Sequence, residues 1–155
     1  MFDAPIDTVT LWAGVGAVSV AVLTVIAQAP TTAPPAATAT AAAVDEVTTS
    51  PAGSVERRPL RAQYWSLDGR QLGLQNEGGT SHATLHRVAI PAGDRRLGQV
   101  LDGAGPETVF SSPAEFHQAI DQARNRSRNT RWWSAPDRLT ARHVAWGDVD
   151  VTLVG

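Results

Sequence analysis

The spacing of hydrophobic and polar positions divides the chain into segments of different character. Residues 8–29 carry no charge and are almost entirely apolar or small, whereas residues 30–55 contain almost no large apolar side chain. From residue 56 onward, short runs of alternating apolar and polar positions are separated by glycine and proline. This division predicts an N-terminal tail (1–7), a transmembrane helix (8–29), a flexible linker (30–55) and one globular domain (56–155).

The apolar segment has the length of a membrane span. Its 22 residues (8 to 29) would form a helix of about 33 Å, enough to cross a hydrocarbon core of about 30 Å. Asp3 and Asp7 stand where a signal peptide carries basic residues, and Pro30 follows the segment directly. An uncleaved, single-pass anchor is therefore favoured over a cleaved signal peptide or a buried core helix.

Small and weakly polar residues recur along one side of this predicted helix. Such a seam lets two helices approach closely in lipid, so the expected partners are membrane lipid and another membrane helix or envelope protein. The alternative is that glycine, alanine and threonine are simply common in membrane helices. The seam consists of Thr10, Gly14, Ala17, Ala21, Thr24 and Gln28.

The segment that follows is rich in alanine, threonine and proline. Pro30, Pro34, Pro35 and Pro51 favour extended conformations, and too few large apolar residues are present to offset the entropy of ordering. We therefore expect a disordered tether. Stalks of this composition are typical of surface proteins, so the domain is expected outside the membrane, with a cytoplasmic domain as the alternative.

The remaining sequence predicts antiparallel hairpins. Residues 60–67 and 70–76 flank Asp68-Gly69, and residues 80–90 would add a third strand whose alternation slips at a bulge. A second hairpin is expected near the end of the chain, where residues 138–146 and 149–154 flank Gly147-Asp148.

One helix is predicted between the hairpins. Ser112 can cap it, Pro113 suits its first position and Glu115 would complete a capping box. Its apolar stripe consists of Phe116, Ala119, Ile120 and Ala123. The predicted fold class is α+β, in the order ββ(β)-α-ββ, with this helix covering one face of the sheet.

Composition narrows the chemistry further. Cysteine is absent, which excludes disulfides, cysteine metal sites and a thiol nucleophile. All thirteen basic residues are arginines, and acidic residues number fifteen, so no nucleic-acid partner is expected.

No motif predicts catalysis, a cofactor or a metal. His82 and His86 would lie about 13 Å apart on a strand, too far to share one metal ion. Ser81-His82 and Ser111-Ser112 lack the surroundings of a nucleophilic serine, and Ser112 suits a helix cap. The glycine-rich stretches at 77–79 and 102–105 lack the context of a phosphate-binding loop and are interpreted as turns.

Arginines gather before two adjacent tryptophans. Arginine and tryptophan are frequent anchors of protein interfaces, which makes this segment a candidate partner surface. One alternative is a solvated helix end with the tryptophans in the core, and another is the binding of single-stranded nucleic acid or lipid headgroups. The residues are Arg124, Arg126, Arg128, Arg131, Trp132 and Trp133, with Asn125 as a candidate N-glycosylation site.

Several stretches resemble a known group of proteins. MFDAPID, GLQNEGGTSHATL, VFSSPAEFHQAI and WGDVDVTLVG, with the apolar segment and its tether, resemble a family of small haloarchaeal (archaeal) membrane proteins of unknown function. The resemblance implies an accessory role at the cell surface, alongside pilus- or secretion-type gene sets. We expect a non-enzymatic, membrane-anchored scaffold; the alternatives are an envelope enzyme or ligand-binding domain, and a minor pilin-like subunit.

Overall fold

The computed structural model describes residues 32–128 and 131–155, and nearly all of them belong to one compact unit, Ala33–Gly155. The predicted tail, the segment 8–29 and its seam lie outside the described residues. None of the helices in the described ranges has both the length and the apolar character that crossing a bilayer requires. The predicted fold class, which combined a membrane-spanning helix with a disordered tether, is therefore corrected to a small α+β domain.

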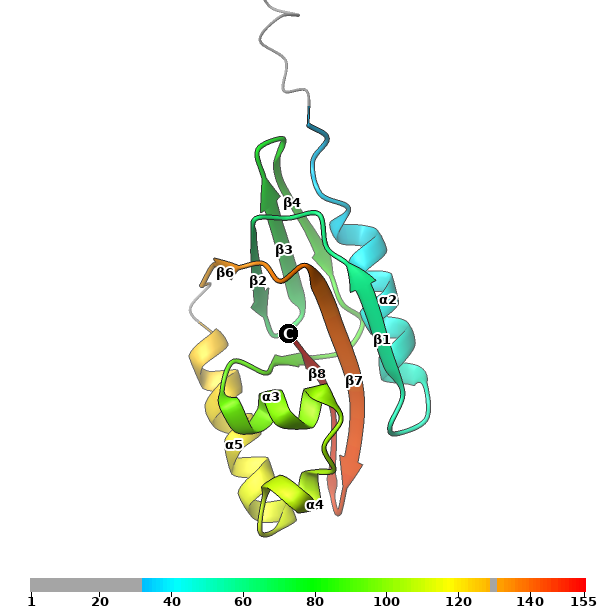
Figure 1. Cartoon of the computed structure of the whole chain (residues 1–155), viewed down its shortest axis with the longest axis vertical. Helices are drawn as coiled ribbons and strands as arrows, with labels where there is room; N and C mark the ends of the chain where they lie inside the picture. The colour runs from blue at the N-terminus through cyan, green and yellow to red at the C-terminus, as the bar shows by residue number, and fades with distance from the viewer. Residues whose placement is uncertain (1–31, 129–130) are drawn as a thin grey trace, which may run out of the picture. The chain divides into compact units, whose positions relative to one another are not determined.

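Two four-stranded sheets form the framework (Figure 1). The central sheet has the order β1-β7-β8-β5, and its pairs are antiparallel except for the parallel pair β5–β8. The outer sheet has the order β4-β3-β2-β6 and is antiparallel throughout. The strands are β1 (Val55–Pro59), β2 (Tyr64–Asp68), β3 (Gln71–Asn76), β4 (Gly79–Thr84), β5 (Ala89–Pro91), β6 (Trp133–Ser134), β7 (Arg138–Trp146) and β8 (Val149–Val154).

The predicted tether contains helix α2 (Ala37–Thr49), so the expectation of disorder there is wrong. Its buried face places Ala37, Ala41, Val44 and Val47 at helical spacing, and these side chains join one core with residues of both sheets. Small alanines let the helix approach the strands closely, which offsets the weak hydrophobicity of each side chain. Arg58 also donates a hydrogen bond to the carbonyl of Ala39 at 2.8 Å.

Both predicted hairpins form. In β2–β3 the register pairs Asp68 with Gln71, so the two-residue turn is Gly69-Arg70, one position later than expected, and Gly69 adopts a positive φ of 55°. The β7–β8 hairpin turns at Gly147-Asp148 as predicted.

The predicted third strand is only half correct. β4 ends at Thr84, and the chain then crosses to the central sheet as β5. The slip in the alternation is not a bulge, because Leu85 turns into the core as the chain leaves the outer sheet.

Four α-helices occupy the described residues instead of the single covering helix expected: α2, α3 (Arg95–Asp102), α4 (Pro106–Val109) and α5 (Pro113–Ser127). Helix α5 begins as predicted, with the Ser112 hydroxyl accepting from the Glu115 amide at 3.3 Å. Glu115 reaches back to the amide of Ser111 at 2.8 Å, one residue earlier than in a standard capping box.

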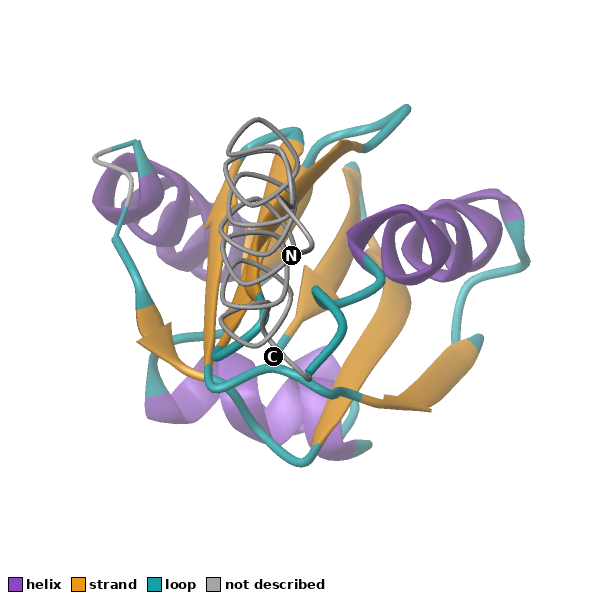
Figure 2. Ribbon diagram, turned by 90° about the horizontal axis from the view of Figure 1, so that it is seen from above, coloured by secondary structure: helices purple, strands orange, loops and turns teal. Residues whose placement is uncertain are grey.

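The central sheet is covered on both faces, and Figure 2 shows helices on either side of the strands. Leu139, Ala141 and Val154 pack with α2 and the outer sheet. On the other face, Val144, Val151 and Leu153 pack with α3 and α5, together with the predicted stripe of α5. This alternation follows from the two-residue period of a strand. With α5 packed on this face, its C-terminal end lies next to the edge of the outer sheet.

Candidate partner-binding site

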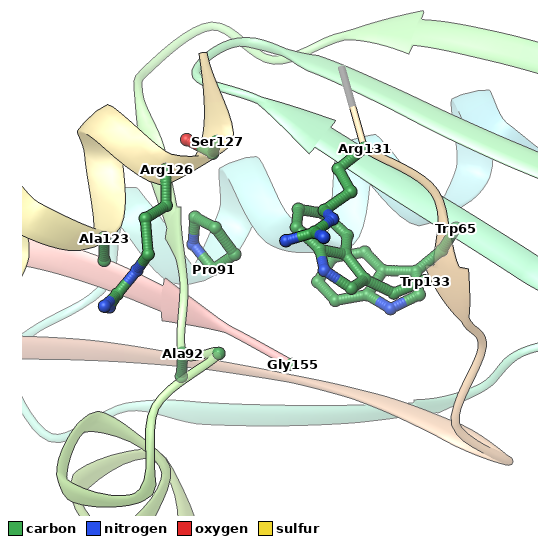
Figure 3. A pocket seen from close by; sticks show the side chains of 10 residues that line it. Trp65, Pro91, Ala92, Ala123, Arg126, Ser127, Arg131, Trp133 and Gly155 are labelled. Atoms are coloured by element: carbon green, nitrogen blue, oxygen red, sulfur yellow. The ribbon is translucent and has the colours of Figure 1, made fainter. Parts of the chain in front are cut away.

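A pocket of about 310 Å³ lies between the end of α5, the loop after β5 and strands β2 and β6 (Figure 3). Its lining is mostly apolar, with two arginines and without an acidic side chain. The lining residues are Trp65, Pro91, Ala92, Gly93, Ala123, Arg126, Ser127, Arg131, Trp133 and Gly155. A concave, largely apolar surface with a few polar groups is the usual form of a binding site.

Two tryptophans from distant segments form one wall of the pocket. Trp65 on β2 and Trp133 on β6 are register partners, and their ring centroids lie 5.5 Å apart with an interplanar angle of 44°. Strand β6 is extended by a hydrogen bond from the amide of Ala135 to the carbonyl of Gln63 at 2.8 Å. Trp65 is 7% exposed, so it is fixed by the core, whereas Trp133 is half-buried.

The two arginines of the lining differ in their surroundings. Arg126 donates to Asp94 at 3.2 Å, and the same carboxylate caps α3 by accepting from the amides of Arg96 and Leu97 at 2.9 Å. Arg131 is exposed, and no carboxylate among the described residues forms an ion pair with it. In Figure 3 the two side chains lie on opposite sides of Pro91, with Arg131 next to the tryptophans.

The structure brings together only half of the predicted partner surface. Arg126, Arg131 and Trp133 line the pocket. Arg124, which pairs with Asp121 at 3.4 Å, and Arg128 border a separate hollow instead. The split arises because residues two positions apart on a helix point in different directions.

The other two predicted residues lie away from the pocket lining. Trp132 packs edge-on against His82, with ring centroids 6.1 Å apart, on the face of the outer sheet opposite its core. Asn125 is exposed on α5, which is compatible with the glycosylation hypothesis but does not test it.

The histidines considered as metal ligands lie in unrelated surroundings. His82 is on β4 beside Trp132, whereas His86 follows that strand and contacts Asp45 of α2 through Nδ1 at 2.7 Å. Within the described ranges, no three side chains of the histidine, cysteine, aspartate and glutamate types gather in a metal-binding arrangement. The stretches at 77–79 and 102–105 lie at the β3–β4 turn and between α3 and α4.

Sequence reasoning missed a buried histidine. Nδ1 of His143 lies 2.6 Å from the carbonyl oxygen of Ser50, and Nε2 lies 2.7 Å from Asp150 Oδ1. Burial lowers the pKa of His143, but the hydrogen bonds to Asp150 and Ser50 outweigh it, so the pKa is raised above its usual value. The two contacts join the end of α2 to β7 and β8, so the role of His143 is structural.

Sequence reasoning also missed most of the residues that line the pocket. Trp65, Pro91 and Ala123 come from three segments that no local pattern connects. The one available indication was the tryptophan in a predicted strand, because an aromatic residue near a sheet edge often packs against a neighbouring strand.

A family model matches most of the chain. The model of a family of unknown function (DUF7283) matches residues 3–144. No match was found among curated proteins or among solved structures. Because the family model covers most of the sequence, the chain belongs to this family of unknown function, DUF7283.

Proposed function

We propose that the domain is a non-enzymatic interaction module that binds a protein partner through the pocket between α5 and β6. The observation that carries the proposal is the placement of Arg131 beside the Trp65–Trp133 pair in a concave, mostly apolar surface. Tryptophan and arginine are enriched among the residues that contribute most to interface affinity, especially where they line a pocket.

The pocket can supply useful binding energy. Burial of apolar surface contributes about 25 cal/mol per Å², so one partner side chain that loses about 100 Å² gains roughly 2.5 kcal/mol. Trp65 is held by the core and β6 by its backbone pairing, so little conformational entropy is lost when a partner binds.

An accessory or scaffold role at the cell surface, linked to a pilus- or secretion-type envelope assembly, extends this proposal. Its support is the apolar sequence of residues 8–29 and the motifs of the resemblance, and no contact among the described residues bears on it. Fractionation of cells that express the full chain, followed by protease treatment of intact cells, tests the location. Recovery of an intact chain in the soluble fraction would contradict it.

Photo-crosslinking in native cells tests partner binding. A photoreactive phenylalanine replaces Gly93, which lines the pocket, is exposed and has open space where a side chain would begin. The control replaces Glu56, which is exposed on β1. We expect a discrete adduct from position 93 that Arg131→Gln weakens. Absence of an adduct, or the same adduct from position 56, would refute the proposed site.

A further inference from the structure

We infer that the pocket receives a partner segment in which one aromatic or branched aliphatic side chain lies next to a single carboxylate. This inference rests on the proposed function and specifies the chemistry of the partner. It joins three observations: the size of the pocket, its aromatic wall, and the ion pair with Asp94 that one of its two arginines, Arg126, forms.

The size of the pocket limits what it can hold. At about 310 Å³ it lies at the lower end of the range of about 300–1,000 Å³ that is typical of small-ligand sites. A cavity of about 150 Å³ already holds a benzene ring, so this pocket takes one ring or branched side chain together with an adjoining carboxylate, whereas a whole helix does not enter it. The tilted Trp65–Trp133 pair offers the faces and edges against which an aromatic ring packs well.

The charges of the lining favour one anionic group. Asp94 offsets the charge of Arg126 through their 3.2 Å contact, and it also orients the guanidinium. Arg131 adds a second positive charge, and the pocket has no acidic residue in its lining. The local balance is therefore close to one positive charge, which matches a single carboxylate next to the apolar side chain.

A polyanion fits this surface less well. Nucleic acid binding needs several cations along a track, and each neutralised phosphate needs its own cation. Arg124 is paired with Asp121, and Arg128 borders the hollow that Asp68 also lines, so neither continues the charge of the pocket. The observations favour a peptide with one acid over nucleic acid.

A fragment titration of the full-length protein tests the inference. The probes are 3-phenylpropionate, its neutral amide 3-phenylpropanamide, and acetate, observed through the tryptophan indole N–H resonances. We expect 3-phenylpropionate to shift the resonances of Trp65 and Trp133 with millimolar affinity, and the amide and acetate to bind at least fivefold more weakly.

Two arginine variants separate the pocket from general surface charge. Arg131→Gln should lower the affinity for 3-phenylpropionate to that of the amide. The matched control is Arg128→Gln, which removes an exposed arginine two residues beyond Arg126 outside the pocket lining. The control should leave the affinity within twofold of the wild type.

The outcomes distinguish this inference from the proposed function. Equal affinity for the acid and the amide would overturn the carboxylate part. No shift with any probe, while the crosslink at position 93 persists, would overturn the partner chemistry but leave partner binding intact. Loss of both would overturn both proposals. Tighter binding of a ten-nucleotide single-stranded DNA, lost in Arg128→Gln as in Arg131→Gln, would replace the peptide with nucleic acid.

Discussion

Replacing Val44 with alanine tests whether α2 is part of the folded core. Val44 is 3% exposed and packs in the core that α2 shares with both sheets. The change removes two buried carbons, worth about 1.6 kcal/mol at about 0.8 kcal/mol each. The cavity left behind adds up to about 1 kcal/mol, and the better helix propensity of alanine returns about 0.5 kcal/mol. We expect a net loss of about 2 kcal/mol.

The sign of the change in the free energy of unfolding distinguishes a packed helix from a disordered tether. In a disordered tether the same change would be neutral, and in an isolated helix it would stabilise. Urea unfolding measures the change in stability, with tryptophan fluorescence as the reporter, to which Trp65 in the same core contributes. Thr38→Ala is the control, because Thr38 is exposed on α2, and it should be neutral or slightly stabilising. Unchanged or higher stability in Val44→Ala would refute the packing of α2.

Two further predictions concern His143 and Gly73. The pKa of His143 is raised in the folded state, so its contribution to the free energy of unfolding is fully present below about pH 6.5. That contribution is lost as the pH rises through the folded pKa. Urea unfolding at several pH values should show the loss, and Asp150→Asn should make it smaller. A Cβ at Gly73 would lie 2.5 Å from Ser66 Oγ and 3.0 Å from Trp132, so Gly73→Ala should destabilise the fold by about 1–3 kcal/mol. It should also increase the quenching of Trp132, which is already partly exposed. A Cβ at Gly98 in α3 would make only an ordinary contact, 3.9 Å from the carbonyl oxygen of Ala92, so Gly98→Ala should stabilise. Equal effects of the two glycine changes would contradict the packing of Trp132.

Local sequence patterns predicted the elements whose determinants are local. The start of α5 follows from Ser112 and Pro113, and the β7–β8 hairpin follows from alternation around Gly147. The parallel pairing of β5 with β8 joins segments about 60 residues apart and leaves no local trace. Helix α2 was misinterpreted for a related reason. Alanine and threonine bury little surface alone, and only the two sheets that enclose them make their burial favourable.

The candidate site could be predicted only in part for the same reason. Arg131 and Trp133 are close in sequence, so their pairing of charge and aromatic surface was visible. The rest of the site depends on Trp65, which packs against Trp133, and on Asp94, which contacts Arg126 across 32 positions of sequence. These contacts follow from the arrangement of the sheets, which no motif encodes.

The affinity of the crosslinked partner tests the central claim most directly. Once that partner is identified from the adduct at position 93, its binding to the wild-type chain is measured beside that to Arg131→Gln and Arg128→Gln. We predict at least a fivefold loss for Arg131→Gln and less than a twofold change for Arg128→Gln. Equal losses, or no loss in either variant, would contradict the claim that the pocket beside Trp65 and Trp133 binds the partner.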